Sequence, residues 1–278
     1  MSSTQGIQAE VPTAVFGPVT GDIYQRQMGR GSQRLAEPFL DFVAANLRGA
    51  AALDVGCGTG SLSFAMARRD PTASVTGCDI SKALLAHGRA ANPYPDRVRF
   101  EPGNACALPF SDNSFDLVLS SLVLMFVPDG ALAAKEMARV AKPGGVVATA
   151  TWDLRGGVIT ARMSYDSIVA LGVPGADSWR ARQLGGPGVR PGELAKLWRA
   201  AGLRDVREGQ ITIRMDFANF ADYWEPAIQG PILPGLLHGL SPEWHERVRR
   251  AVESAFLVGD ADGPRSFAAT AWVVAGMR

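Results

Sequence analysis

The stretch LDVGCGTG, residues 53–60, decides the fold. It completes a short apolar run over residues 51–55 and then places Gly56, Gly58 and Gly60 at alternate positions. Glycine adopts positive φ and lets a ligand approach bare backbone. The helical spacing that follows, Leu62 to Met66, predicts a helix whose first N–H groups are free. A strand, a glycine turn and a helix therefore follow one another, and the turn either binds a ligand or serves only as a corner.

Strands alternate with helices over the rest of the chain. Strands are expected over residues 51–55, 74–80, 98–100, 115–124, 145–152, 206–213 and 266–274. Helices are expected over residues 32–47, 62–66, 82–91, 131–141, 163–171, 194–201, 220–228 and 242–257. Pro38 is expected near the start of its helix or as a break in it, and Pro143 is expected to end another. This alternation predicts an α/β fold with a doubly wound parallel sheet.

Composition excludes few classes of protein. The chain has 278 residues, 47% hydrophobic and 20% charged, with a formal net charge of +1. That balance gives no sign of nucleic-acid binding, and we expect the basic run Arg247, Arg249 and Arg250 to be a solvated helix face. No signal-peptide pattern and no run of about 20 apolar residues is found, so we expect a cytoplasmic protein without a membrane span.

The three cysteines indicate neither disulfides nor a metal site. Cys57, Cys78 and Cys106 lie in separate segments without a CxxC pair. An odd number without zinc spacing argues against both a disulfide framework and a bound metal. We expect buried free thiols and no metal.

Two acidic residues sharpen the interpretation of the glycine turn. The pattern here is GxGxG, whereas a dinucleotide fingerprint reads GxGxxG above a pyrophosphate. Asp54 precedes the turn, where its carboxylate would repel a pyrophosphate and suit an ammonium group. Asp79 follows Gly60 by nineteen residues at the end of the second strand, where a carboxylate accepts hydrogen bonds from ribose hydroxyls.

Three further stretches complete the pattern. They are YQRQMGR (residues 24–30), NACALPFSDNSFD (residues 104–116) and KPGG (residues 142–145). In this order, with the glycine turn, they resemble the class I S-adenosylmethionine-dependent methyltransferases. The Asn104–Ala105 pair resembles the branch of the ubiquinone and menaquinone C-methyltransferases. The resemblance covers residues 24–152 and implies a Rossmann-like, seven-stranded mixed sheet, the last strand antiparallel, with helices on both faces and a helical cap and insertions.

The resemblance also assigns roles around S-adenosylmethionine, whose product is S-adenosylhomocysteine. The glycine turn would pass the methionine half, Asp79 would hold the ribose, Ile80 would pack on the adenine and Asn104 would read its edge. The full set of expected cofactor residues is Tyr24, Arg30, Asp54, Gly56, Gly58, Gly60, Ser63, Asp79, Ile80, Asn104, Ala105, Ser120 and Ser121. Of these, Ser120 or Ser121 would face the sulfonium or the acceptor, and Tyr24 and Arg30 would close the site.

The remainder of the chain is expected to shape the methyl-acceptor site. Residues 1–48 would form an N-terminal arm and helical cap, and residues 49–278 the cofactor-binding domain with insertions at 154–191 and 214–262. The acceptor would be a small molecule, hydrophobic or aromatic if Trp152, Trp179, Tyr223 and Trp224 line its pocket. The sequence identifies no general base; the candidates are His87, His238, His245, Tyr165 and Asp166.

Two other functions remain open. A nicotinamide-dependent oxidoreductase uses a similar glycine corner and ribose acid, but GxGxG and Asp54 disfavour it. A non-catalytic protein that binds S-adenosylmethionine would share the same sequence through residue 152. Turnover of an acceptor separates this alternative from an enzyme. The atom methylated and the oligomeric state are not predicted.

Overall fold

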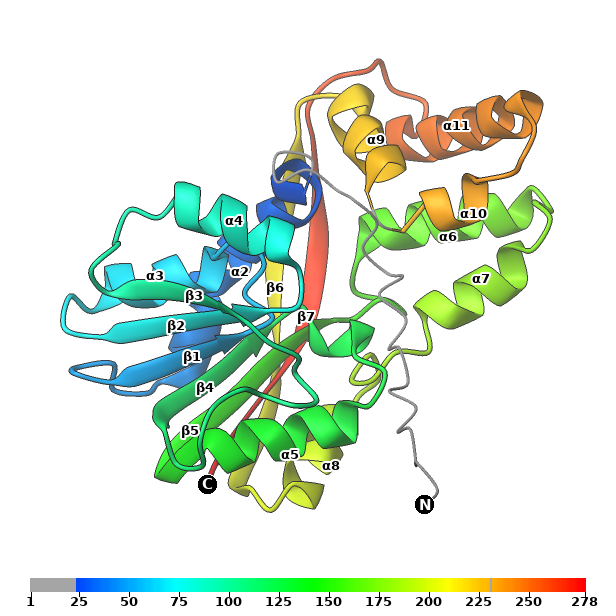
Figure 1. Ribbon diagram of the computed structural model, residues 1–278. Helices are drawn as coiled ribbons and strands as arrows, with labels where there is room; N and C mark the ends of the chain where they lie inside the picture. The colour runs from blue at the N-terminus through cyan, green and yellow to red at the C-terminus, as the bar shows by residue number, and fades with distance from the viewer. Residues whose placement is uncertain (1–23, 231) are drawn as a thin grey trace, which may run out of the picture.

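A seven-stranded sheet forms the centre of the molecule, in the strand order β3-β2-β1-β4-β5-β7-β6 (Figure 1). The computed structural model describes residues 24–230 and 232–278. The strands are β1 (Ala51–Val55), β2 (Ser74–Asp79), β3 (Val98–Pro102), β4 (Phe115–Ser121), β5 (Ala141–Trp152), β6 (Arg204–Phe217) and β7 (Arg265–Met277). Strands β1 to β5 pair in parallel, whereas β7 is antiparallel to both β5 and β6. The structure confirms the expected mixed sheet.

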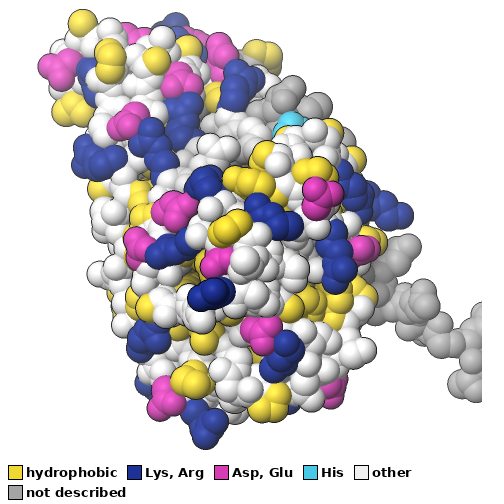
Figure 2. Space-filling model, turned by 90° about the vertical axis from the view of Figure 1, so that its left-hand side faces the viewer, with side chains coloured by type: hydrophobic (Ala, Val, Ile, Leu, Met, Phe, Trp, Pro, Cys, Tyr) yellow, Lys and Arg dark blue, Asp and Glu magenta, His cyan; other side chains and the backbone are white. Residues whose placement is uncertain are grey.

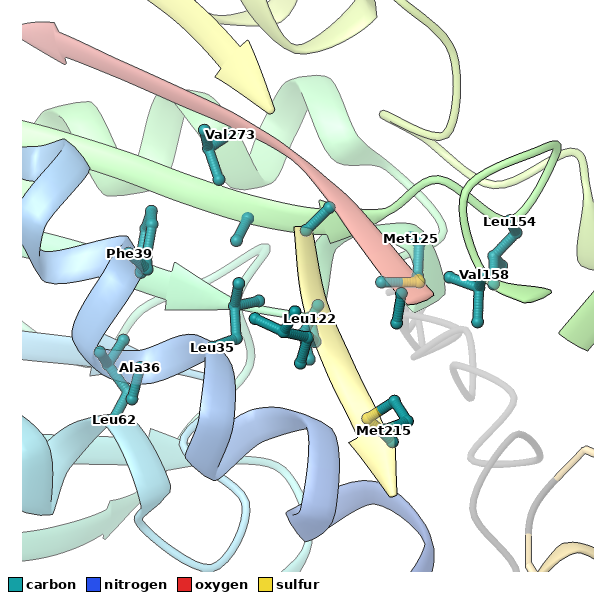
Figure 3. Close-up of a cluster of buried hydrophobic side chains, with 14 of the residues drawn as sticks. Leu35, Ala36, Phe39, Leu62, Leu122, Met125, Leu154, Val158, Met215 and Val273 are labelled. Atoms are coloured by element: carbon teal, nitrogen blue, oxygen red, sulfur yellow. The ribbon is translucent and has the colours of Figure 1, made fainter. Parts of the chain in front are cut away.

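Helices cover both faces of the sheet. They are η1 (Gln25–Gly29), α2 (Arg30–Val43), α3 (Ser61–Arg69), α4 (Lys82–Ala90), η2 (Leu124–Phe126), α5 (Gly130–Val140), α6 (Ile159–Ala170), α7 (Ala176–Gln183), α8 (Glu193–Ala200), α9 (Phe220–Gln229), α10 (Pro234–Leu237) and α11 (Pro242–Leu257). Successive strand residues point to opposite faces: Ala52 packs with the core beneath α2 and α3, and Leu53 with the core beneath α5 and α8. Figure 3 shows Leu35 and Phe39 of α2 within the first of these cores.

The helices α6, α7, α9, α10 and α11 gather at one end of the long strands β6 and β7 (Figure 1). They come from the two segments expected to be insertions. The second segment starts later than expected, because β6 continues to Phe217 before α9 begins. Helices α7 and α10 were not expected, since both are short and lie in stretches rich in Gly and Pro.

Several expected boundaries are wrong. Helix α2 ends at Val43 instead of 47, where Ala44 adopts a left-handed conformation. Pro38 lies inside α2 without breaking it, because burial of Leu35 and Phe39 outweighs one lost backbone hydrogen bond. The fourth strand ends at Ser121, since Leu122 has a φ of 63° and η2 follows. Pro143, expected to end a helix, lies within β5.

The described surface carries charges of both signs. Figure 2 shows Lys and Arg interspersed with Asp and Glu, and neither sign forms a continuous patch on that face. On α11, Arg249 and Arg250 both pair with Glu246, at 3.1 and 2.6 Å, and Arg249 also pairs with Glu253 at 3.0 Å, so two arginines of the basic run are engaged in ion pairs. No helix among the described residues is long and apolar enough to cross a membrane.

Candidate active site

The turn between β1 and α3 is held in a left-handed backbone conformation. Gly56, Gly58 and Gly60 have φ values of 73°, 55° and 95°, a region that L side chains rarely adopt. A Cβ at Gly56 would lie 2.4 Å from Val123 Cγ1, and one at Gly58 would lie 2.7 Å from the Tyr24 hydroxyl. The turn therefore requires glycine both for its backbone and for the close packing of its neighbours.

Asp79 joins this turn to the end of β2. Its Oδ2 accepts a hydrogen bond from Gly58 N at 2.9 Å, and its Oδ1 accepts one from Ser81 N at 2.8 Å. Burial raises the pKa of this carboxyl above its usual value, although the backbone donors oppose that shift. An ionised carboxylate has about four lone-pair sites, so Asp79 keeps acceptor capacity toward the cavity that it lines.

A cavity of ≈270 Å³, termed here the large cavity, opens at the carboxyl ends of β1, β2 and β4. The expected cofactor residues that line it are Tyr24, Gly56, Asp79, Ile80, Asn104 and Ala105. The Ile80 side chain is 56% exposed, which is unusual for isoleucine. An exposed apolar side chain at this position is suited to covering the flat ring of a ligand. Asn104 Oδ1 accepts from Cys106 N at 2.9 Å, which leaves its amide hydrogens free to donate.

Asp54 and its neighbours form a separate polar cluster behind the turn. Asp54 is 2% exposed and accepts a hydrogen bond from Ser63 Oγ at 2.6 Å. Burial raises the pKa of Asp54 to about 7, against the lowering effect of Ser63. Asp54, Thr59 and Ser121 line a cavity of ≈20 Å³. The hydroxyls of Thr59 and Ser121 are buried without a hydrogen-bond partner, so this cavity is polar and large enough for one water molecule.

Seven expected cofactor residues do not line the large cavity: Arg30, Asp54, Gly58, Gly60, Ser63, Ser120 and Ser121. Ser63 bonds to Asp54, and Ser120 points back into the sheet, where its hydroxyl donates to Val55 O at 2.9 Å. Ser121 faces the polar cluster. Arg30 forms a two-pronged ion pair with Asp222 of α9, at 2.6 and 2.9 Å, and its guanidinium lies 4.6 Å from the centre of the Phe217 ring. The resemblance could not show that pairing, because the partners lie on distant segments.

A second cavity, of ≈150 Å³, lies beside the large one beneath the helices at the end of β6 and β7. Met28 of η1 and Phe126 of η2 line both cavities. Its walls come from η1, η2, α6, β6 and α9, together with the segment after β5. Figure 3 shows three of its apolar side chains, Met125, Leu154 and Val158, lying together.

Most of the expected aromatic and base candidates lie elsewhere. Trp152 and Tyr223, two of the four residues expected in an aromatic pocket, line the second cavity, and so does the candidate base Tyr165. Trp179 packs edge-on against Tyr165 at 4.9 Å, and Trp224 stacks on Phe220 at 5.8 Å, so these two tryptophans belong to the core.

The three histidines line neither cavity, and Asp166 pairs with Arg162 at 2.6 Å. Within the described part of the chain no group of His, Cys, Asp or Glu is arranged to hold a metal ion. Cys57 and Cys78 are buried free thiols, whereas Cys106 is half-buried, contrary to the expectation that all three are buried. The described residues therefore offer neither a histidine base nor a metal at either cavity.

Sequence reasoning missed the residues that join the two cavities. Met28 lies within the YQRQMGR stretch, but only its flanking Tyr24 and Arg30 were singled out. Phe126 ends η2, two residues beyond the strand that was expected to run to residue 124, and it was assigned to no element. An interpretation of η2 as a turn at the strand's carboxyl end would have found Phe126, since ligands in open α/β sheets bind there.

The strand order, the glycine turn and the acidic residue that ends β2 together define the class I methyltransferase fold. Residues 53–149 match the family described as the methyltransferase domain, so the chain contains a methyltransferase domain. That match covers β1 to most of β5 and hence much of the wall of the large cavity. The second cavity is lined largely from outside it.

Curated relatives include demethylmenaquinone methyltransferases of Staphylococcus aureus, with 46% identity over 101 residues. The alignment spans 36% of this chain and 42% of the relative. Among solved structures, phosphoethanolamine N-methyltransferase 2 of Haemonchus contortus, in complex with S-adenosyl-L-methionine, matches with a TM-score of 0.57 and 18% identity over 94% of this chain and 60% of that one. The [4+2]-cyclase SpnF matches with a TM-score of 0.52 and 22% identity over 88% of this chain and 80% of that one. These structures share the fold, and the cyclase shows that the fold alone does not determine the reaction.

Proposed function

We propose that this protein transfers the methyl group of S-adenosylmethionine to a small, largely apolar acceptor. The cofactor would occupy the large cavity and the acceptor the second cavity. The observation that carries the proposal is the junction of the two cavities at Met28 and Phe126, because methyl transfer needs the donor and the acceptor to meet in line. The relatives named demethylmenaquinone methyltransferases support an apolar acceptor, although they match less than half of their own length.

The residues of the large cavity fit this cofactor. Asp79 would accept hydrogen bonds from the ribose hydroxyls with the lone pairs that Gly58 and Ser81 leave free. Ile80 would cover one face of the adenine, and the free amide hydrogens of Asn104 would meet its ring nitrogens. Asp54 would act on the cofactor's ammonium group across the polar cluster, since it does not line the large cavity itself.

The protein's contribution to the reaction would be alignment and the exclusion of water. The bound cofactor supplies an activated methyl group on a positively charged sulfur. Holding the two reactants in attack geometry can lower the barrier by about 7–11 kcal/mol. As the bond from the methyl group to sulfur breaks and its bond to the acceptor forms, the positive charge would be spread over both partners and then leave with the acceptor's proton to solvent. The apolar side chains at the junction, Met28 and Phe126, therefore do not oppose the transfer step.

In the same proposal, residues 24–48 serve as the cap, and the helices at the end of β6 and β7 roof the acceptor; the arm expected before residue 24 lies outside the described residues. We also propose a cytoplasmic protein that acts on small molecules. The ion pairs of Arg249 and Arg250 on α11 support an acceptor other than nucleic acid.

Calorimetric titration with S-adenosylmethionine, S-adenosylhomocysteine and NADH tests the cofactor assignment, with Asp79→Ala titrated in parallel. We expect both adenosyl ligands to bind the unmodified protein, NADH not to bind, and the variant to lose affinity. Transfer of a tritiated methyl group to a panel of apolar alcohols, amines and phenols then tests the enzyme. Tight NADH binding would instead support an oxidoreductase. Cofactor binding without transfer to any acceptor would support a non-catalytic binding protein.

A further inference from the structure

Two hydroxyl groups, Ser164 of α6 and Tyr223 of α9, lie side by side in the wall of the second cavity and are termed here the hydroxyl pair. Both residues are buried, at 3% and 8% exposure. Their oxygens form a close hydrogen bond with one another, and the Tyr223 hydroxyl also donates to the backbone oxygen of Thr160 at 3.0 Å. The pair is therefore a connected polar feature in a cavity whose walls also include the apolar side chains Trp152 and Met215 and the polar side chains Arg26, Gln27 and Asp222.

The protons of the hydroxyl pair are fully used within the protein. A serine and a tyrosine hydroxyl carry one proton each. Tyr223 gives its proton to Thr160 O, so the hydrogen bond between the two hydroxyls must use the proton of Ser164. What remains is lone pairs on the two oxygens. Burial raises the pKa of Tyr223 to about 12, so the phenol keeps its proton throughout the neutral range.

This donor count limits what the pair can bind. A ligand group that meets lone pairs alone must bring its own proton, as an O–H or N–H does. A carboxylate, ether or ketone oxygen would face another acceptor without a hydrogen between them, and a buried polar group without a partner is costly. Acceptor-only groups are thus disfavoured at this point of the cavity.

We propose that the hydroxyl pair is a hydrogen-bond-accepting anchor, so that the molecule taken by the second cavity is an apolar compound bearing a hydroxyl or N–H group directed at Ser164 and Tyr223. This inference deepens the proposed function and names the class of acceptor: aromatic or alicyclic alcohols and amines rather than ethers or ketones. The same anchor would select among similar apolar molecules, since a site built for a hydrogen bond discriminates against analogues that cannot form it.

Binding of 1-naphthol and 1-methoxynaphthalene tests the anchor. The two probes share a ring system, but only the first can donate a hydrogen bond. Calorimetric titration gives the dissociation constant of each probe, measured once with saturating S-adenosylhomocysteine and once without it. We expect 1-naphthol to bind about twofold to tenfold more tightly, the range of one neutral hydrogen bond. Hydrophobicity alone would favour the methoxy compound, so the expected preference has the opposite sign.

Variants of the pair assign the preference to these two oxygens. Ser164→Ala combined with Tyr223→Phe removes both acceptors and should bring the ratio of the two dissociation constants close to one. Ser164→Ala alone, which keeps the tyrosine contacts with α6, should lower the ratio if the double variant does not fold. Ser167→Ala is the matched control, because Ser167 lies on the same helix and does not line the cavity.

Three results would overturn the anchor: equal binding of the two probes by the unmodified protein, no binding of 1-naphthol, or a preference that survives in the double variant. Titration of S-adenosylhomocysteine in the same samples keeps this test separate from the proposed function. Loss of cofactor binding argues against the methyltransferase, whereas normal cofactor binding with no probe preference argues only against the anchor.

Discussion

Replacing Arg30 by Met should weaken the attachment of α9 to α2. In the protein Arg30 and Asp222 are only 19% and 30% exposed and meet through two hydrogen bonds, and the guanidinium also lies over Phe217. Removing one partner of a fully buried ion pair costs about 3–5 kcal/mol, and an exposed pair contributes about 0–1 kcal/mol. Between these limits we expect a loss of about 2 kcal/mol in the free energy of unfolding, or about 4–8 °C in Tm.

The measurement is urea unfolding at pH 7 followed by tryptophan fluorescence. Arg34→Met is the matched control, since Arg34 lies on the same helix and pairs with Asp216 at 2.6 Å, but the two side chains are 41% and 55% exposed. That variant should lose less than about 1 kcal/mol. If the two variants lose equal stability, the burial argument is wrong.

Acidification and cofactor titration provide two further tests of Arg30. The Arg30 guanidinium holds the pKa of Asp222 below its usual value. The pair's stabilisation is therefore present above the usual carboxyl pKa and is lost as the pH falls through the lowered one. Arg30→Met should accordingly lose less stability on acidification than the unmodified protein. The dissociation constant of the Arg30→Met variant for S-adenosylmethionine should stay within about threefold of that of the unmodified protein, because loss of a hydrogen bond to the cofactor would change it by more. A rise above about tenfold would restore the cofactor role that the resemblance assigned to Arg30.

Three other perturbations address the large cavity and the polar cluster. Asp79→Asn should weaken S-adenosylhomocysteine binding by about tenfold or more, since it removes a charged acceptor; calorimetry showing less than a threefold change would contradict that role. Burial raises the pKa of Asp54 to about 7, so its ionisation lowers the free energy of unfolding as the pH rises from about 4 toward 7. Asp54→Asn should flatten that decline in urea unfolding measured across this pH range. A pH profile identical to that of the unmodified protein would contradict the role of Asp54. Gly56→Ala should lose both stability and cofactor affinity, because its Cβ would meet Val123 at 2.4 Å. Gly144→Ala, with a similar φ of 79° and open space around it, should show only the backbone cost of about 1–2 kcal/mol; equal effects of the two substitutions would rule out the steric argument.

The errors of the sequence-based prediction fall where packing overrides local preference. Pro38 was expected to limit its helix, but the helix continues because its apolar face is buried against the sheet. The fourth strand was expected to run to residue 124, since apolar residues resume after Ser121, but Leu122 turns the chain with a positive φ. Neither outcome is visible in residue type, because each depends on contacts with segments distant in sequence.

The sequence by itself determined the sheet, the glycine turn and the acidic residue at the end of the second strand. These features are local: apolar periodicity reports which residues are buried, and glycine spacing reports a backbone that other residues adopt only with strain. The tertiary structure alone decided the second cavity and the partner of Arg30. Met28, Phe126, Ser164 and Tyr223 come from four separate helices, and they become neighbours only when the cap and the helices beyond β5 and β6 fold over the sheet.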